Sequence, residues 1–103
     1  MPNLKDYLGR EIRLTHERLL HILEHPEMNG LESLIDEALK SPEMVIESLS
    51  DEKVWLFYRQ LPEARVGVNW LCVVVKYQER DAFILTSYLT DRPKKGRQRW
   101  PVR

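Results

Sequence analysis

The sequence contains little of what marks several common classes of protein. It has a single cysteine, Cys72, so the chain forms no internal disulfide. The longest unbroken apolar run, from Trp70 to Val75, has six residues, whereas a membrane-spanning helix needs about 20. The first residues carry no apolar stretch behind a basic start, which predicts no secretory signal. These absences predict a reducing, cytoplasmic setting and no membrane partner.

Motifs for common cofactors are also missing. The four glycines form no nucleotide-binding loop, and no Gly-x-Ser-x-Gly elbow of the serine hydrolases occurs. The zinc-protease pattern places two histidines four residues apart, whereas His16 and His21 are five apart. His25 stands at the break before Pro26, and one cysteine is too few for a structural zinc site. We therefore expect neither a metal nor another cofactor.

The charge is balanced overall but divided along the chain. Residues 1–51 hold five Lys or Arg and eleven Asp or Glu, a balance of −6, and residues 52–103 hold eleven and five, a balance of +6. If the two halves form different layers, the basic layer will attract polyanions although the protein as a whole is neutral. The alternative is that the helices carry ordinary surface glutamates and that the tail is basic without consequence.

Two short helices are predicted in the first half of the chain. Thr15 is a suitable N-cap for a helix over 16–24, which Pro26 ends. Asn29, with an acidic residue at Glu32, is predicted to cap a second helix with an apolar stripe over 31–39, ended by Ser41 and Pro42.

Beyond residue 42 the apolar pattern changes from helical to strand-like. Strands are predicted over 44–48, 54–61, 69–77 and 82–90, with a turn over 62–67 and a four-residue hairpin connection over 78–81. Residues 1–10 are expected to be loose, and 92–103 form a basic tail. The whole chain, 1–103, is expected to be a single domain. Its expected α+β fold has two N-terminal helices packed on one face of an antiparallel sheet of about four strands, with room for a fifth short one.

Alternation along the strands predicts which side chains share a face of the sheet. The all-apolar sets are assigned to the helix-covered face: Leu71, Val73 and Val75, with Phe83, Leu85 and Leu89. Lys76, Thr86 and Tyr88 would then share the open face, together with either Tyr58 or Arg59. A cation, a hydroxyl and a phenol on a rigid sheet suit phosphate recognition. The alternative is an ordinary solvated sheet face.

The tail and the histidines are the other candidates for chemistry. The tail could neutralise phosphates and stack a base on its tryptophan, or its tryptophan could instead pack back on the domain. The histidines could transfer protons near neutral pH or simply occupy a polar helix face. The tail residues predicted to bind RNA, with Arg59, are Lys94, Lys95, Arg97, Arg99 and Trp100.

Two segments resemble a known group of small phage- and bacteria-associated domains. The opening, Thr15-His16-Glu17-Arg18 followed by His21-Ile22 and His25-Pro26-Glu27-Met28, is one of them. The other is Val73-Val74-Val75-Lys76, Phe83 to Asp91 and Lys94-Lys95-Gly96. Over residues 10–100 the chain is similar to the Barnase–EndoU–Colicin–RelE-like (BECR) fold of metal-independent ribonucleases and toxins. Where such domains often have Thr-Ala-Tyr, this chain has Thr86-Ser87-Tyr88.

The resemblance implies a cytoplasmic endoribonuclease that binds RNA on the open sheet face. Such a protein would be a toxin of a toxin–antitoxin or phage-conflict system, with an antitoxin or immunity protein as partner. The catalytic residues implied by matching positions are His16, Arg18, Lys76, Thr86 and Tyr88. We expect His16, Lys76 and Tyr88 to converge in one shallow site. The alternatives are a non-catalytic RNA- or protein-binding module on the same fold, or a structural protein.

Overall fold

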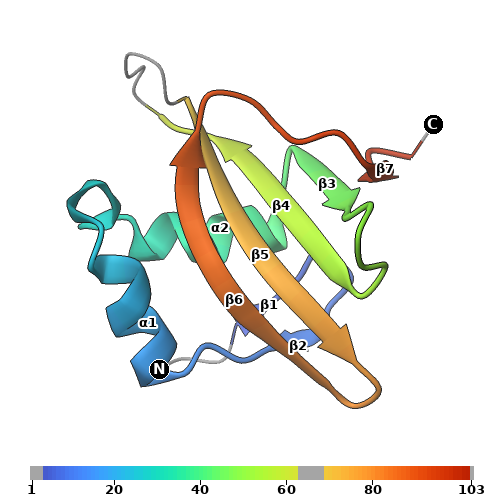
Figure 1. The fold of residues 1–103 in the computed structure, drawn as a ribbon, viewed down its shortest axis with the longest axis horizontal. Coiled ribbons are helices and arrows are strands. Elements are labelled where there is room, and N and C mark those ends of the chain that lie inside the picture. The colour runs from blue at the N-terminus through green and yellow to red at the C-terminus, as the bar shows by residue number, and fades with distance from the viewer. Residues whose placement is uncertain (1–3, 63–68, 103) are drawn as a thin grey trace.

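The computed structural model describes residues 4–62 and 69–102 and has an α+β fold, as predicted (Figure 1). The helices are α1 (His16–Leu23) and α2 (Glu32–Lys40), with the 3-10 turn η1 (Pro26–Met28) between them. A five-stranded antiparallel sheet has the order β6-β5-β4-β3-β7. Its strands are β3 (Met44–Glu47), β4 (Val54–Gln60), β5 (Trp70–Gln78), β6 (Asp81–Thr90) and β7 (Arg97–Trp100). The fifth strand is formed by the basic tail. Apart from Pro62, the turn predicted over 62–67 lies outside the described residues.

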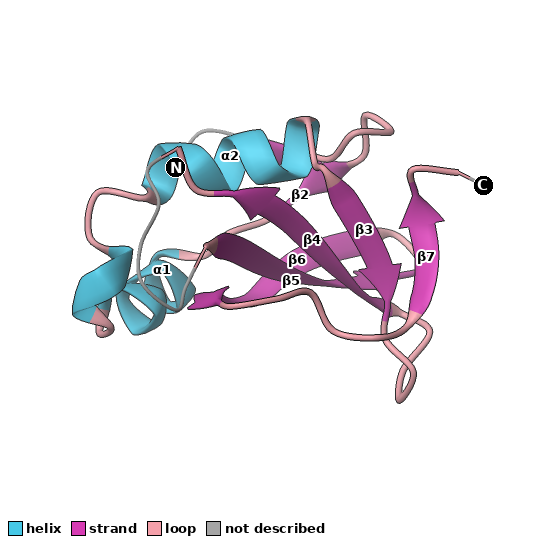
Figure 2. Ribbon diagram, turned by 90° about the horizontal axis from the view of Figure 1, so that it is seen from above, coloured by secondary structure: helices cyan, strands magenta, loops and turns pink. Residues whose placement is uncertain are grey.

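The helices and the sheet enclose the main core. Helix α2 lies across one face of the sheet and α1 packs beside β6 (Figure 2). Both helices direct apolar side chains inward, including Ile22, Ile35 and Leu39, against Phe57 and Val73 of the sheet. All five side chains are at most 1% exposed. Residues 71, 73 and 75 of β5 face this core, as alternation predicted.

Residues 4–12 form two short strands and a turn, whereas residues 1–10 were predicted to be loose. Strand β1 (Leu4–Lys5) pairs with β2 (Glu11–Ile12), and Leu4 is buried in the main core. The Asp6 carboxylate accepts backbone hydrogen bonds from Leu8 and Arg10, both at 2.9 Å, and Gly9 turns the chain at φ 83°. Hydrogen bonds at the turn produce this order. The sequence pattern did not reveal it, because two-residue strands have no detectable period and hydropathy does not report hydrogen bonds.

The helix ends follow the predicted signals in three places out of four. Thr15 caps α1, its Oγ1 accepting from the Arg18 N–H at 3.1 Å, and α2 ends at Lys40 before Ser41 and Pro42. Helix α1 ends before Pro26, which begins η1. The predicted Asn29 cap is wrong, because α2 begins at Glu32 without a side-chain cap.

The start of α2 is displaced by the turn that precedes it. The Asn29 N–H donates to Pro26 O at 3.1 Å, which ends η1, and Gly30 then adopts φ 80°. Leu31 donates to Met28 O at 3.1 Å and is buried. The turn closed by the hydrogen bond from Leu31 to Met28, together with the burial of Leu31, therefore places the start of α2 beyond Asn29.

The hairpin between β5 and β6 is tighter than predicted and contains a β-bulge. Gln78 pairs with Asp81, so the connection has two residues instead of four. Val74 pairs with Thr86 but Val75 pairs with Ile84, which leaves Leu85 as the extra residue. A bulge of this kind reverses the alternation on one side of it.

The bulge explains an error in the predicted faces of β6. Phe83 and Leu85 were expected on the helix-covered face, but Ile84 lies there and Leu85 packs on the opposite face. Phe83 pairs with Lys76, which also lies on that opposite face. Beyond the bulge the prediction holds, with Leu89 on the helix side and Tyr88 on the other.

The face opposite the helices is covered, not open. It carries a second apolar cluster, with Ile46, Leu56, Tyr58, Cys72 and Val74 all buried. Because β6 and β7 lie at opposite edges of the sheet, residues 91–96 cross this face to connect them (Figure 2). Four strand spacings span about 19 Å, and seven residue steps reach roughly 24 Å when extended. The crossing segment must therefore run nearly straight, close to the sheet.

Candidate functional site

A pocket of about 280 Å³ lies where the crossing segment passes over the helix-free face. We call it the crossover pocket. It brings together four of the side chains predicted from the sequence, Thr86 and Tyr88 of β6 with Lys94 and Lys95 of the crossing segment. The other lining residues are Ser48, Leu49, Val54, Leu56 and Val74. Hydroxyl groups and two cations thus border a concave, otherwise apolar surface.

The two lysines of the crossover pocket are unneutralised. Lys94 and Lys95 are exposed, and within the described ranges neither side chain has a carboxylate within ion-pair distance. The segment is held down by its backbone, since the Lys94 N–H donates to the Tyr58 hydroxyl at 3.0 Å. At Gly96 an added Cβ would lie 2.5 Å from the Glu47 carbonyl oxygen, so the chain there fits closely against β3. The backbone is therefore fixed while two ammonium groups stay free to meet an anion.

Tyr88 belongs to a buried polar cluster beneath the pocket. Burial is the main cause that raises the pKa of Tyr88 and of Tyr58 well above the usual phenol range. Burial also raises the pKa of the Cys72 thiol to about 11, although hydrogen bonds with both phenols oppose this. Both phenols are therefore protonated at neutral pH. They can donate a hydrogen bond, but the raised pKa makes each a weaker proton donor than an ordinary phenol, and neither can act as a base.

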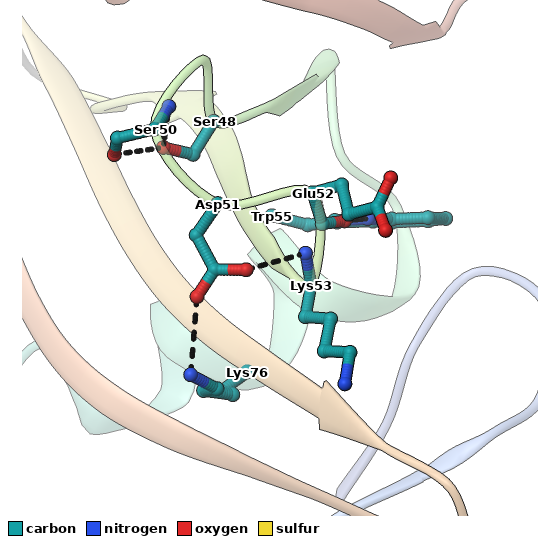
Figure 3. A network of polar contacts seen from close by, with 7 residues as sticks. All are labelled: Ser48, Ser50, Asp51, Glu52, Lys53, Trp55 and Lys76. Carbon is teal, nitrogen blue, oxygen red and sulfur yellow. Dashed lines mark hydrogen bonds and ion pairs between the residues drawn. The ribbon is translucent and has the colours of Figure 1, made fainter.

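Lys76 lies beside the crossover pocket and is already paired. Its Nζ is 3.0 Å from Oδ2 of Asp51, and the other Asp51 oxygen accepts from the Lys53 N–H at 2.9 Å (Figure 3). The pKa of Asp51 is lowered, first by the Lys53 backbone hydrogen bond and then by Lys76. Lys76 therefore anchors the loop that supplies Ser48 and Leu49 to the pocket, and we regard it as a positioning residue.

The same loop is fixed by its own hydrogen bonds. The Ser48 and Ser50 hydroxyls are 3.0 Å apart, and the Trp55 indole donates to the Glu52 carbonyl at 3.2 Å (Figure 3). The loop that supplies Ser48 and Leu49 to the crossover pocket is therefore held by hydrogen bonds of its own.

His16 and Arg18 do not line the crossover pocket. Both are exposed on α1, which stands beyond the β6 edge of the sheet (Figure 1). Within the part of the chain that the structure describes, neither side chain makes a hydrogen bond or an ion pair. Lys76 is also absent from the lining, so of the predicted trio His16, Lys76 and Tyr88 only Tyr88 lines the pocket.

The other histidines also lie on the surface. His21 Nδ1 is 3.7 Å from Glu24, and His25 Nδ1 is 3.6 Å from Glu27. Among residues 4–62 and 69–102, no three His, Cys, Asp or Glu side chains are grouped so that they could hold a metal ion.

Arg59 faces the helices and not the predicted RNA-binding surface. Tyr58 pairs with Cys72 on the helix-free face, so the next residue points to the other side. The Arg59 guanidinium donates to the Ser41 carbonyl at 2.6 Å and lies 3.8 Å from Glu37. It therefore binds the C-terminal end of α2. The sequence left Tyr58 and Arg59 as alternatives, and pairing with β5 decides between them.

The basic tail is divided between the two sides of the sheet. The guanidinium carbon of Arg99 is 4.5 Å from the centre of the Trp55 ring, and the Trp100 ring is 5.6 Å from that of Tyr7. Trp55 and Tyr7 belong to the helix-side core. Trp100 thus packs back on the domain, which was one of the two alternatives, and it does not share a surface with Lys94 and Lys95.

A second pocket, of about 840 Å³, lies where β7 meets the N-terminal turn and the end of α2. We call it the edge pocket. It is lined by Tyr7, Leu8, Lys40, Ser41, Pro42, Trp55, Gln98, Arg99, Trp100 and Val102. The sequence did not indicate it because residues 1–10 were expected to be loose and residues 92–103 were predicted only as a basic tail. The available signal was an aromatic residue in each of the two terminal segments, Tyr7 and Trp100, although neither segment has a hydrophobic period.

No family model, curated protein or solved structure matches the chain in comparisons of sequence and fold. The resemblance to BECR ribonucleases is therefore still a prediction. Among the described residues, no helix is long and apolar enough to cross a membrane.

Proposed function

We propose that the chain is a metal-independent endoribonuclease whose crossover pocket binds the scissile phosphate. One observation carries this proposal: a single pocket is lined by two hydroxyl side chains of β6, Thr86 and Tyr88, and by two lysines of the crossing segment, Lys94 and Lys95. In the described ranges neither lysine has a carboxylate partner. Ammonium groups neutralise a phosphate, and hydroxyls hydrogen-bond its oxygens. The same residues carry the resemblance to the BECR group.

The proposed reaction is attack of the RNA 2′-oxygen on the adjacent phosphorus. The new bond forms a cyclic phosphate, the bond to the 5′-oxygen breaks, and that oxygen takes up a proton. Tyr88 lines the pocket, and we assign to its hydroxyl a hydrogen bond to the departing 5′-oxygen, which takes its proton from solvent water. The described lining contains no imidazole or carboxylate, so we assign the 2′-hydroxyl proton to solvent water. Lys94 and Lys95 stabilise the charge that develops on the phosphate.

His16 and Arg18 would act outside the pocket in this scheme. Both are exposed. They belong to α1, which stands beside β6, the edge strand that carries Tyr88 (Figure 1). We propose that they contact the RNA strand as it leaves the pocket. His16 is the first residue of α1, and the N-terminus of a helix attracts anions such as the RNA phosphates.

The proposed setting is the cytoplasm, and the proposed partners are RNA and an inhibitor protein. A ribonuclease produced inside a cell requires control, and an antitoxin or immunity protein would provide it. A phage-conflict or toxin–antitoxin system is the corresponding biological context.

The test is RNA cleavage in the presence of EDTA. Purified protein should cleave single-stranded RNA to products with cyclic phosphate ends. The Lys94→Ala/Lys95→Ala double variant should lose about 10²-fold or more in rate with little change in melting temperature, and Tyr88→Phe should lose about as much in rate. Arg80→Ala removes an exposed cation at the distant hairpin turn and is the matched control. Wild-type protein that leaves RNA intact under all metal-free conditions would exclude the proposal.

A non-catalytic RNA-binding module is the second candidate. The absence of an imidazole or carboxylate from the described lining of the crossover pocket favours it, because these are the side chains that most often act as general bases. This module would bind RNA through Lys94 and Lys95 and leave it uncut. A purely structural protein would show neither cleavage nor binding.

A further inference from the structure

The edge pocket collects three of the most exposed large apolar side chains of the molecule. Leu8 is 60% exposed, Trp100 39% and Val102 79%, and all three line it. Pro42 and Trp55 line the same pocket. Apolar side chains gathered around a concavity of this size are typical of a contact surface for another molecule. The proposed ribonuclease site does not use this pocket, which lies on the other side of the sheet.

The pocket adjoins an edge of the sheet. Strand β7 is the last in the order β6-β5-β4-β3-β7, and among the described residues it pairs only with β3. Backbone groups along the outer side of such a strand are available to pair with an added strand. An extended peptide that pairs with β7 would therefore pass beside the edge pocket.

The charge of this edge selects among the peptides that could pair there. Arg97 and Arg99 lie 3.8 and 3.7 Å from a single carboxylate, that of the buried Glu47. Residues 92–100 contain no acidic residue, and their cations are Arg92, Lys94, Lys95, Arg97 and Arg99. Pairing of β7 with the β7 of a second copy would bring like charges together. The edge thus disfavours self-association and favours an acidic strand.

RNA fits the edge pocket less well than a peptide does. The Arg99 guanidinium is already placed over Trp55 and near Glu47, and Lys40 Nζ lies 3.3 Å from Asp36. Both cations of the lining thus already lie near carboxylates, and most of the remaining lining is apolar. An apolar side chain of a peptide is the better occupant.

We propose that the edge pocket and the outer side of β7 form a docking site for an extended acidic segment of a partner protein. The segment adds a strand to β7, one of its carboxylates meets Arg97, whose side chain is 73% exposed, and one large apolar side chain lies among Leu8, Trp100 and Val102. The inference does not depend on ribonuclease activity, because peptide binding is measured without RNA.

The experiment selects ligands from a displayed library of random twelve-residue peptides with the purified full chain. The enriched sequences should be acidic with an apolar residue at alternate positions. A synthetic peptide of the enriched sequence, labelled for fluorescence anisotropy, should bind wild-type protein. The same peptide methylated on alternate backbone nitrogens should bind at least about tenfold more weakly, because it cannot complete the strand pairing.

Surface variants locate the binding site. Leu8→Ser and Val102→Ser should each weaken peptide binding about tenfold, as expected for loss of a buried apolar contact, and Arg97→Glu should abolish it. Leu49→Ser is the matched control, because Leu49 is 79% exposed but lines the crossover pocket. Its affinity for the peptide should be unchanged.

Several outcomes would overturn this inference. The library could yield no binder, or binders without acidic residues. The Leu8→Ser and Val102→Ser proteins could bind as tightly as the wild type. A concentration-dependent dimer that Leu8→Ser dissociates would identify a second copy as the occupant. Oligouridine binding that depends on Trp100 and not on Lys94 or Lys95 would identify RNA.

Discussion

The Tyr77 hydroxyl donates a 2.7 Å hydrogen bond to the carboxylate of Asp6, which lies 71 positions earlier in the chain. This contact joins the N-terminal turn to the C-terminal end of β5. The same carboxylate accepts from the Arg10 guanidinium at 2.8 Å and from two backbone N–H groups, so Asp6 is buried with all its acceptor positions engaged. The Arg10 guanidinium in turn lies 4.2 Å from the centre of the Tyr77 ring and 4.8 Å from that of Trp55.

Asp6→Asn should therefore destabilise the protein although it preserves the shape of the side chain. The amide has one acceptor oxygen, and its NH₂ group would face donors. Because Arg10 is 40% exposed, water compensates part of the loss. We expect the free energy of unfolding to fall by about 1–3 kcal/mol, measured by urea denaturation. Asp36→Asn, at a surface ion pair, should cost less than about 0.5 kcal/mol. Equal effects of the two variants would contradict the role assigned to Asp6.

Gly96→Ala tests whether the crossing segment lies against the sheet. The new methyl group would come within 2.5 Å of both the Glu47 carbonyl oxygen and the Ile46 side chain. Relief of this clash must shift the segment or β3, at a cost of about 1–3 kcal/mol in the free energy of unfolding. The neighbouring Lys95→Ala substitution removes only an exposed side chain and should change it by less than about 0.5 kcal/mol. A Gly96→Ala protein as stable as the wild type would show that the segment lies away from β3.

The sequence predicted the elements that have a period and missed those that do not. The stripe of α2 and the alternation of β5 placed Ile35, Leu39, Val73 and Val75 in the core. The two-residue strands β1 and β2 are too short for any period, and a single side chain, Asp6, orders the turn between them. Local signals also cannot reveal that residues 91–96 cross the sheet, because the crossing follows from strand order.

The candidate site was predicted in part for the same reason. Thr86 and Tyr88 follow the bulge at Leu85, so alternation placed them on the correct face even though it failed for Phe83. Tyr58 and Arg59 could not be separated, because adjacent strand residues differ only in phase, which pairing with β5 fixes. The partner of Lys76 was missed, since Asp51 lies 25 positions away in a loop without a period.

The Cys72 thiol should be unreactive in the folded protein. It is fully buried between two tyrosines, and burial raises its pKa to about 11, so almost none of it is the reactive thiolate at pH 8. Labelling by a disulfide reagent at pH 8 should therefore be far slower than that of free cysteine. It should accelerate to the rate of free cysteine in concentrated urea. Rapid labelling without denaturant would show that residues 91–96 open readily and expose the cluster.

The salt dependence of RNA binding tests the electrostatic role of the crossover pocket. For a single strand, the slope of log affinity against log salt changes by about 0.7 for each phosphate contact. Because Lys94 and Lys95 are unpaired cations of one pocket, the Lys94→Ala/Lys95→Ala protein should show a slope shallower by about 1.4. Arg80→Ala should keep the wild-type slope, since it lies at the far hairpin turn. Affinities for oligouridine measured between low and physiological ionic strength, at several salt concentrations for each protein, provide the slopes. If the double variant and the wild type share one slope, phosphate binds elsewhere, and the crossover pocket then has neither the catalytic nor the RNA-binding role.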